Sequence, residues 1–512
     1  IRDDKYHLRF LFTFTVENLQ RFMPQQKNLL STIALISGPL LAILLGLLPS
    51  PDSAHPHLML MAGITIWIAL WWLTEVIHIA VTSLIPFVIL PICGISDIKV
   101  VAAQYMDPVL FLFIGGFFLA FAIEHWGLHK RIALKILSVT GRNASMLLLG
   151  VMLTAWIISM WISNTATVMM LLSAVLAVIY QIDHHIDNKT HHRKLASALM
   201  IGLAYAATIG GMATLVGTPT NMIFYRAYMD AYPTAGDLTF LSWFKIGFPV
   251  SALLFFATWL TLRSRIPKKE LQGVFDVGVF KEGYKNLGKI SPDEKRVGFI
   301  FILTAVLWFT RADIPLGTFT IKGWSKLFSN SSQIQDSTVA IFMAILLFII
   351  PSKTMPGKKL LEWKETSKLP YDIILLFGSG FALAKGFEDS GLSNYLAAQL
   401  QILQGVNPIW IILMVCVLVT VISEFASNVA SIQLVLPILV SLQQAMHLPP
   451  LLLMIPATLA ASLGFMMPIA TAGNTIVFSS GHIKTKEMAV AGFVANLTGI
   501  VLITLICYLA FA

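Results

Sequence analysis

Long apolar runs separated by short polar loops occupy nearly the whole chain. Many of these runs approach the roughly 20 residues that a helix needs to cross the hydrocarbon of a bilayer. The pattern predicts an all-α polytopic membrane protein with about 11 transmembrane helices. The expected spans lie near residues 29–49, 58–73, 77–93, 107–127, 196–229, 243–262, 297–310, 337–351, 371–388, 450–478 and 488–511.

Four of the apolar stretches are interrupted by small polar residues. Residues 144–180 and 402–440 each carry a polar break in the middle, which predicts re-entrant hairpins that enter the membrane and return on the same side. The spans 196–229 and 450–478 are expected to be broken helices, because Gly, Pro and Thr occur at their centres. Irregular backbone at membrane depth is tolerated only inside protein or along a hydrated cavity, so these breaks indicate a binding site.

Basic residues mark one set of loops. With the N-terminus inside the cell, the cytoplasmic segments hold 28 of the 35 Lys and Arg residues, as the positive-inside rule requires. These segments are 1–28, 128–143, 181–195, 263–296, 352–369 and 476–488. The distribution predicts an N-in, C-out orientation in which hairpin 144–180 opens to the cytoplasm and hairpin 402–440 to the outside.

Composition excludes several classes of protein. The chain is 57% hydrophobic and 12% charged, against roughly 25% charged in a soluble domain. The net charge of +9 lies in short loops rather than on one polar face, so no nucleic-acid partner is expected. Cys93, Cys416 and Cys507 fall inside apolar segments and are expected to be core residues without disulfides. Because the first residue is Ile, we expect a trimmed N-terminus with no visible signal peptide.

The chain also contains an internal repeat. Residues 116–128 and 380–392 agree at seven positions with an offset of 264, and the same offset pairs Ser163-Asn164 with Ser427-Asn428. Residues 211–221 match 464–474 at an offset of 253. The copies begin five spans apart, so they are expected to be inverted, as in alternating-access transporters. The predicted organisation is a cytoplasmic segment 1–28, a first repeat 29–262, a cytoplasmic linker 263–296 and a second repeat 297–512.

The broken segments offer ligands for both a cation and an anion. A hairpin tip offers free carbonyls to a cation and free N–H groups to an anion. No Arg, Lys or His lies at either tip, so a dianionic substrate would need a mobile cation to offset its charge. Hard oxygen ligands without a carboxylate suit Na⁺ better than Ca²⁺. Cation and anion would then stabilise each other's binding, which is the basis of coupling.

These motifs resemble the divalent-anion/sodium symporter family, which includes the bacterial INDY-type dicarboxylate transporters and the animal dicarboxylate and citrate carriers. The resemblance rests on residues 70–75, the Ser163-Asn164-Thr165 motif, and residues 210–221, 423–431 and 470–474. It implies a homodimer in the bacterial inner (cell) membrane and an elevator mechanism, with a scaffold of outer spans and a moving domain that contains the hairpins and broken helices.

The resemblance also implies the site residues. Sodium site 1 would comprise Ser159, Ser163, Asn164 and Gly217, and sodium site 2 would comprise Ser423, Ala426, Asn428 and Ala470. The substrate carboxylates would contact Asn164, Thr165, Thr218, Pro219, Asn428, Val429, Thr471 and Ala472. The expected function is sodium-coupled symport of C4-dicarboxylates such as succinate, malate and fumarate.

Two positions depart from the family pattern. Val429 lacks the hydroxyl that Thr165 offers in the first half, and residues 471–474 read Thr-Ala-Gly-Asn where relatives often have Thr-Pro-Pro-Asn. Sodium-independent dicarboxylate exchange and citrate or sulfate transport on the same fold therefore remain alternatives.

Other interpretations of the polar residues are less favoured. Glu424 could couple protons, although a hydrogen-bonded buried carboxylate is the simpler prediction. His184, His185, His191 and His192 could suggest a metal but lack ordered ligand spacing, which favours a solvated loop. An intramembrane enzyme would need a nucleophile and base or acidic metal ligands near the repeats. Neither occurs there, so no enzyme is expected, and a channel would not need paired hairpins.

Overall fold

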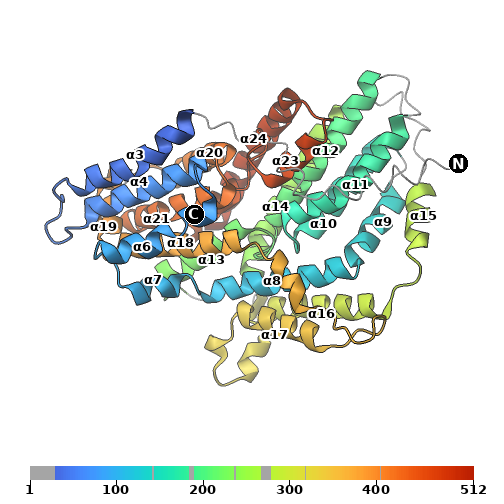
Figure 1. Ribbon diagram of the computed structural model, residues 1–512, viewed down its shortest axis with the longest axis horizontal. Helices are drawn as coiled ribbons and strands as arrows, with labels where there is room; N and C mark the ends of the chain where they lie inside the picture. The colour runs from blue at the N-terminus through green and yellow to red at the C-terminus, as the bar shows by residue number, and fades with distance from the viewer. Residues whose placement is uncertain are drawn as a thin grey trace.

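The computed structural model describes residues 29–140, 143–183, 189–235, 238–266, 278–316, 319–403 and 405–511. The segment 1–28, expected in the cytoplasm, lies outside the described residues, as do the middle of the expected linker and the loop residues His184 and His185. The described chain is predominantly helical, and its helices pack into one elongated body (Figure 1).

The helices of the N-terminal half are α3 (Leu29–Gly46), α4 (Leu58–Thr74), α5 (Ile79–Thr82), α6 (Ile85–Ile92), α7 (Ile98–Gln104), α8 (Pro108–His125), α9 (Leu128–Thr140), α10 (Ala144–Ser159), α11 (Asn164–Asp183), α12 (Lys189–Gly211), α13 (Pro219–Ala231) and α14 (Phe240–Ser264). The C-terminal half contains α15 (Gly278–Asn286), α16 (Pro292–Phe309), α17 (Asp336–Ile349), α18 (Tyr371–Asp389), α19 (Leu392–Leu400), α20 (Pro408–Phe425), α21 (Asn428–Ala445), α22 (Leu451–Ala460), α23 (Ala472–Ser479) and α24 (Thr485–Phe511). Four short 3₁₀ helices are η1 (Trp324–Leu327), η2 (Ser331–Gln333), η3 (Trp363–Lys368) and η4 (Gln401–Leu403).

Each interrupted stretch forms two helices with a short break between them. The expected hairpins correspond to α10 with α11 and to α20 with α21, and the second begins and ends later along the chain than its sequence suggests. The expected broken helices correspond to α12 with α13 and to α22 with α23. Side-chain caps define several of these helix starts, since Asn143 accepts a hydrogen bond from the Met146 amide (2.9 Å) and Asn407 accepts one from the Ile409 amide (3.1 Å).

Six helical segments among the described residues are long and apolar enough to cross a membrane by length and composition. Seven shorter apolar helices accompany them. The arms of the second hairpin, α20 and α21, are two of the six. Because these arms are joined directly at their tip, the chain returns to the side from which it came whether or not each arm crosses. The side of the membrane on which each later segment lies is therefore the same whether or not the two arms cross.

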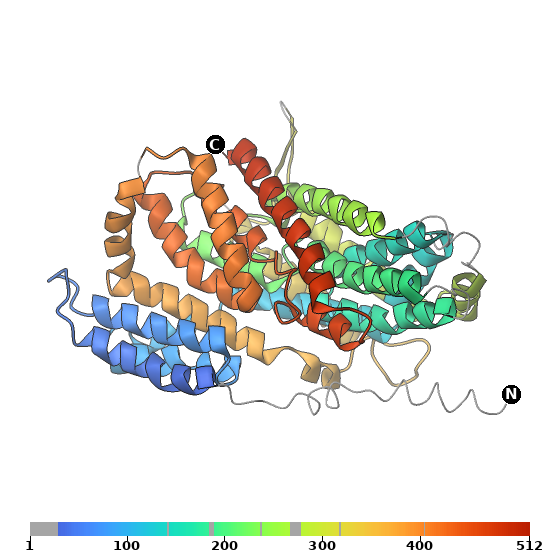
Figure 2. The same cartoon turned by 90° about the horizontal axis from the view of Figure 1, so that it is seen from above.

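Buried apolar side chains form two clusters. The larger cluster joins α8 to α14 with α20 to α24 and includes most of the hairpins and broken helices. The smaller one holds α4 and α6 against α18 and α19. In the view from above, α3 and α4 lie along one side of the body, with α18 between them and the later helices (Figure 2).

The structure differs from the sequence-based expectation in its loops. Segments expected to be loops contain α7, α9, α15 and α19, because short amphipathic helices carry too few apolar residues to look like spans. The expected span 77–93 is divided into α5 and α6, with Pro86 in the first turn of α6, where proline is compatible with a helix start.

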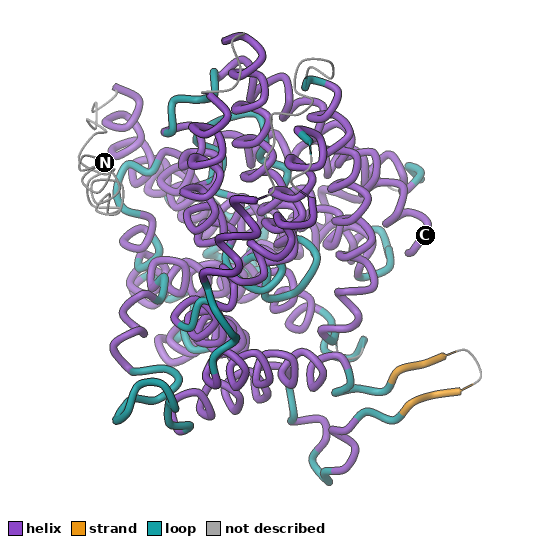
Figure 3. Tube along the Cα trace, turned by 90° about the vertical axis from the view of Figure 1, so that its right-hand side faces the viewer, coloured by secondary structure: helices purple, strands orange, loops and turns teal. Residues whose placement is uncertain are grey.

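The chain is also not entirely α-helical. Strands β1 (Ile314–Leu316) and β2 (Phe319–Ile321) form an antiparallel pair that projects from the helical body (Figure 3). Ile, Phe and Thr favour extended backbone, and this explains a short hairpin that a search for apolar helices does not detect.

Candidate functional site

The first hairpin ends in a compact polar tip. Ser159 is the last residue of α10 and Asn164 the first of α11, and the Ser159 hydroxyl donates to Asn164 Oδ1 across 2.7 Å. The Ser163 hydroxyl accepts the Ala166 amide across 3.2 Å and thereby caps α11. Ser159 is fully buried, whereas Ser163 and Asn164 are half-buried. The tip therefore fixes the amide of Asn164 while leaving part of it accessible.

The second hairpin repeats this geometry 264 residues later. The Ser423 hydroxyl donates to Asn428 Oδ1 across 2.7 Å, and the Ser427 hydroxyl accepts the Ala430 amide across 3.2 Å. Both distances equal those in the first tip. The internal repeat in the sequence is therefore also a repeat of contacts.

The two broken helices are closed by a second pair of equivalent asparagines. Asn221 Nδ2 donates to the carbonyls of Gly211 (3.1 Å) and Thr214 (2.7 Å). Asn474 Nδ2, 253 residues later, donates to the carbonyls of Gly464 (3.0 Å) and Met467 (3.1 Å). Both asparagines are fully buried. They satisfy carbonyls that the interrupted helices leave without an intrahelical partner.

The residues of the first expected sodium site converge at Gly211. A Cβ at Gly211 would lie 2.5 Å from Asn164 Oδ1, and a Cβ at Gly217 would lie 2.5 Å from the Gly211 carbonyl oxygen. Asn164, Gly211 and Gly217 are thus in direct contact, and glycine is required for this approach. Ser163, Gly217 and Pro219 also line a cavity of about 20 Å³ beside the tip. Carbonyl, amide and hydroxyl oxygens meet here, which suits a small hard cation.

The second expected sodium site has the same arrangement around Gly464. A Cβ at Gly464 would lie 3.1 Å from Ala470 Cβ, 3.2 Å from the Ser423 carbonyl oxygen and 3.3 Å from Asn428 Oδ1. Ala426 ends α20 as its C-cap, between Ser423 and Asn428. Sequence reasoning did not single out Gly211 and Gly464, although both stand at equivalent positions of the repeat.

The eight expected substrate contacts all occupy helix N-termini. Asn164 and Thr165 begin α11, Thr218 and Pro219 begin α13, Asn428 and Val429 begin α21, and Thr471 and Ala472 begin α23. The first amides of a helix have no intrahelical acceptor and carry the positive end of the helix dipole. Four helix N-termini therefore offer N–H donors to an anion without any Lys or Arg.

Contacts between the two halves bring several of these helix starts together. A Cβ at Gly473 of α23 would lie 3.3 Å from the Val168 side chain of α11. Thr220 of α13 lies 3.5 Å, hydroxyl to hydroxyl, from Ser462 in the second break. The helix starts of one half therefore adjoin the break and the helix start of the other.

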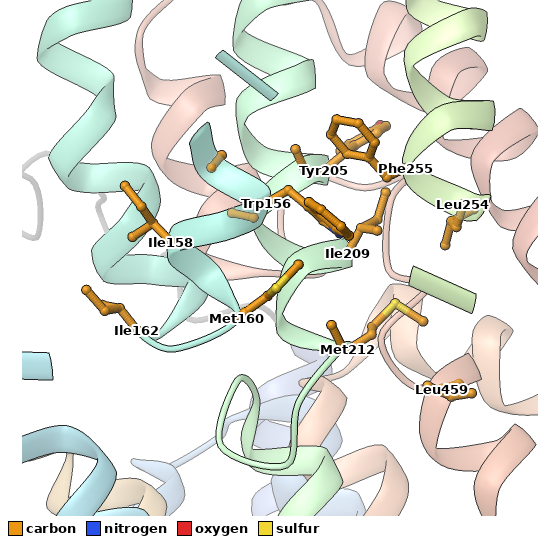
Figure 4. Packing of buried hydrophobic residues seen from close by; sticks show 14 of the residues in the cluster. Trp156, Ile158, Met160, Ile162, Tyr205, Ile209, Met212, Leu254, Phe255 and Leu459 are labelled. Atoms are coloured by element: carbon orange, nitrogen blue, oxygen red, sulfur yellow. The ribbon is translucent and has the colours of Figure 1, made fainter. Parts of the chain in front are cut away.

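Apolar packing holds the first tip in place. Trp156 and Met160 of the hairpin face Tyr205 and Ile209 of α12 and Met212 directly after it (Figure 4). The Trp156 indole donates to the Ser251 hydroxyl across 2.8 Å, and that hydroxyl donates to the Ile209 carbonyl across 2.6 Å. The hairpin, the broken helix and α14 are thus joined around one aromatic side chain.

Glu424 binds the backbone of the second break. Its carboxylate accepts the amides of Phe465 (2.9 Å), Met466 (2.8 Å) and Met467 (2.9 Å), and it also accepts Asn496 Nδ2 (2.6 Å). The side chain is 4% exposed, so the expectation of a hydrogen-bonded buried carboxylate is confirmed. The burial of Glu424 follows from its place in an apolar run, whereas these partners lie far away along the chain.

Replacing this carboxylate tests its structural role. In Glu424→Gln one carboxylate oxygen becomes an NH₂ group, which faces a backbone donor instead of accepting from it. We expect a loss of about 1–3 kcal/mol, the penalty for an unsatisfied buried donor, seen as a lower apparent melting temperature in detergent. Glu388→Gln, an exposed carboxylate near the end of α18, is the control. An unchanged melting temperature in Glu424→Gln would contradict the role.

The fold and this site define a polytopic membrane protein in which paired helical hairpins face paired broken helices. The chain belongs to the family described as the sodium:sulfate symporter transmembrane region, whose model matches residues 26–511. The resemblance stated from the motifs is thereby confirmed.

Similar proteins agree with this assignment. The sodium-dependent dicarboxylate transporter SdcS of Staphylococcus saprophyticus is 40% identical over 488 residues, which cover 94% of this chain and 91% of that protein. SdcS of Staphylococcus aureus is 40% identical over 483 residues, covering 93% and 90%. A solved structure of Neisseria gonorrhoeae MtrF, described as illuminating a class of antimetabolite efflux pumps, has a TM-score of 0.55 at 12% identity and covers 95% of this chain and 97% of that one. At that identity the MtrF likeness shows the fold alone.

Proposed function

We propose that this protein is a secondary active transporter that couples Na⁺ to the uptake of C4-dicarboxylates such as succinate, malate and fumarate. The observation that carries the proposal is the placement of all eight expected substrate contacts at four helix N-termini, beside two polar tips of matching geometry. The relatives at 40% identity are named sodium-dependent dicarboxylate transporters, which favours the same substrate class and coupling ion here.

The site supports coupling between ion and substrate. The side-chain oxygen of Asn164 faces the space beside Gly211 and Gly217, while its backbone N–H lies in the first turn of α11. The same residue would contact Na⁺ through an oxygen and the substrate through the helix N-terminus. A bound cation would orient this asparagine and offset the carboxylate charge, so each ligand would raise the affinity for the other.

The proposed transport cycle is of the elevator type. The equivalent contacts at offsets 264 and 253 support two copies of one unit. We infer that the copies are inverted, that the N-terminus is cytoplasmic and the C-terminus external, and that the two tips and two breaks move together against a scaffold that includes α8 and α18. A homodimer in the bacterial inner membrane completes the proposal.

Transport into proteoliposomes tests the function. Uptake of labelled succinate is expected with an inward Na⁺ gradient and is expected to fall to the level of empty liposomes when choline replaces sodium. Undiminished uptake in choline would instead indicate sodium-independent exchange. Competition by excess sulfate or citrate, without competition by malate or fumarate, would move the substrate class to one of those anions.

A further inference from the structure

A large vestibule lined by both polar and apolar side chains lies between two groups of helices. Its volume is about 600 Å³, within the range of roughly 300–1,000 Å³ that is usual for ligand pockets. One wall comes from α13 and α21, which the proposed function assigns to the moving domain, and the other from α18, which it assigns to the scaffold, and from α19, which follows α18 along the chain. Its polar lining includes Arg226, Asp230, Lys385, Glu388 and Gln433.

The vestibule has a much smaller equivalent in the other half. Gly380, Phe381 and Ala384 of α18 line the vestibule. Their counterparts at the 264-residue offset, Gly116, Phe117 and Ala120 of α8, line the cavity of about 20 Å³ beside the first tip. Ala384 is half-exposed, whereas Ala120 is 5% exposed. The structure is therefore open on the side of the second hairpin at these positions and closed on the other.

An ion pair crosses between the two groups of helices next to the vestibule. Arg226 Nε on α13 lies 2.9 Å from Asp107 Oδ2, and Asp107 is the N-cap of α8. The Arg226 guanidinium also lies 5.8 Å from the centre of the Phe381 ring on α18. Asp107 is 5% exposed, so its charge depends on this partner. Arg226 therefore contacts two scaffold helices from a helix of the moving domain.

Arg226 has a second carboxylate that does not cross between the groups. Arg226 Nη1 lies 2.6 Å from Asp230 Oδ1, one helical turn further along α13 itself. Asp107 and Asp230 thus bind the same guanidinium, but only Asp107 joins α13 to α8.

The other half of the repeat cannot form an equivalent pair. The counterpart of Arg226 is Ser479, and that of Asp107 is Tyr371. With two identical inverted copies, the two end states of the cycle would be related by symmetry and equal in energy. The Arg226–Asp107 contact has no counterpart in the second copy, so the two end states need not be equal in energy.

We propose that the Arg226–Asp107 ion pair is a latch that holds the transporter open on the side of the second hairpin, and that it must break for the moving domain to shift. Arg226 and Asp107 are positioning residues that set the balance between the two open states. This inference rests on the proposed elevator function. It adds a named contact and a preferred resting state to that function.

The test measures access at two equivalent cysteines. In a Cys93→Ser background, Ala384→Cys reports the vestibule and Ala120→Cys reports the equivalent position in the other half. Their rates of reaction with a charged methanethiosulfonate reagent are measured on the purified protein in detergent, where both faces are accessible. The background without a reporter cysteine is the blank. Without further changes, Ala384→Cys is expected to react quickly and Ala120→Cys slowly.

Asp107→Asn removes the ion pair while keeping the helix cap, because an asparagine oxygen can still accept the Val109 amide that Asp107 accepts at 2.9 Å. We expect the Ala384→Cys rate to fall by about tenfold and the Ala120→Cys rate to rise, because a tenfold change corresponds to about 1.4 kcal/mol, the scale of one close ion pair in a partly buried site. Asp230→Asn is the matched control, since it removes the local carboxylate of Arg226, and both rates should stay unchanged.

Two results would overturn the latch. One is unchanged rates at both reporters in Asp107→Asn, and the other is an equal shift in Asp230→Asn. If Asp107→Asn does not fold, the double variant Asp107→Asn with Arg226→Gln removes both charges and must give the same reciprocal change. Labelling needs no substrate, so a failure of succinate transport with intact reciprocal labelling would count against the proposed function and not against the latch.

Discussion

Asn164→Ala is expected to abolish sodium-dependent dicarboxylate uptake while leaving a folded, extractable protein. The substitution removes the oxygen that accepts the Ser159 hydroxyl at 2.7 Å and that faces Gly211 beside the expected sodium site. Helix α11 keeps its cap from Ser163 at 3.2 Å, so the hairpin should still form. Uptake should fall to the liposome background, a loss of at least about a hundredfold, because the proposed function gives this one residue contacts to both ion and substrate.

The equivalent and control variants separate function from folding. Asn428→Ala removes the same oxygen in the second tip and should give the same loss. Asn407→Ala makes the same chemical change at an exposed cap of α20, where the expected cost is about 1 kcal/mol of stability with uptake retained. Normal uptake by Asn164→Ala with a normal size-exclusion profile would refute the assignment of the first tip.

Gly217→Ala should remove stabilisation by sodium. The added Cβ would lie 2.5 Å from the Gly211 carbonyl oxygen and 2.9 Å from Gly211 Cα, both backbone atoms that cannot move aside alone. Inserting a methyl group into such a contact typically costs 1–3 kcal/mol, and here it would displace the backbone that borders the first expected sodium site. The midpoint of sodium-dependent thermal stabilisation should rise by about tenfold or more in sodium concentration.

The second half of the chain supplies the matched control for this substitution. Ala470 occupies the equivalent position and already carries a Cβ, 3.1 Å from where a Cβ at Gly464 would lie. Ala470→Gly creates space rather than a clash, so its effect on the sodium midpoint should be small. Equal midpoints in Gly217→Ala and the wild type would show that the Gly211–Gly217 contact does not border an ion site.

The polar tips could be predicted from the sequence because their determinants are local. A serine five residues before an asparagine, at the end of one apolar run and the start of another, occurs at 159–164 and again at 423–428. Both pairs form a hydrogen bond across the tip, which the sequence alone did not predict. The helix N-termini at Pro219 and Ala472 follow from the same kind of local information, since Thr precedes each and cannot easily continue a helix interior.

The contacts that join distant segments could not be predicted in this way. Glu424 binds amides more than 40 residues away, at Phe465 to Met467, and nothing in its immediate sequence identifies those partners. Asn221 and Asn474 are the last residues of the matching segments 211–221 and 464–474, but their hydrogen bonds to carbonyls depend on the path of the interrupted backbone. Arg226 lies within the expected span 196–229, and its pairing with Asp107 depends on the packing of α13 on α8, which the local sequence does not show.

The two tips keep the same geometry although one residue at the start of the second hairpin helix differs in chemistry from its counterpart. Val429 replaces the hydroxyl of Thr165, yet the second tip keeps its serine–asparagine contact and its cap. The backbone amides at the start of α21 are independent of that side chain. We therefore expect Thr165→Val to affect the choice among dicarboxylates more than the affinity for sodium.

In the proposed function, sodium and a dicarboxylate bind together at the two tips. The most direct measurement is the thermal stability of the purified wild-type protein with succinate, in sodium and in choline, because a ligand that binds only the folded state raises its apparent stability. Succinate is expected to raise the melting temperature in sodium and to leave it unchanged in choline. An equal rise in both salts, or no rise with any C4-dicarboxylate in sodium, would contradict the proposed function.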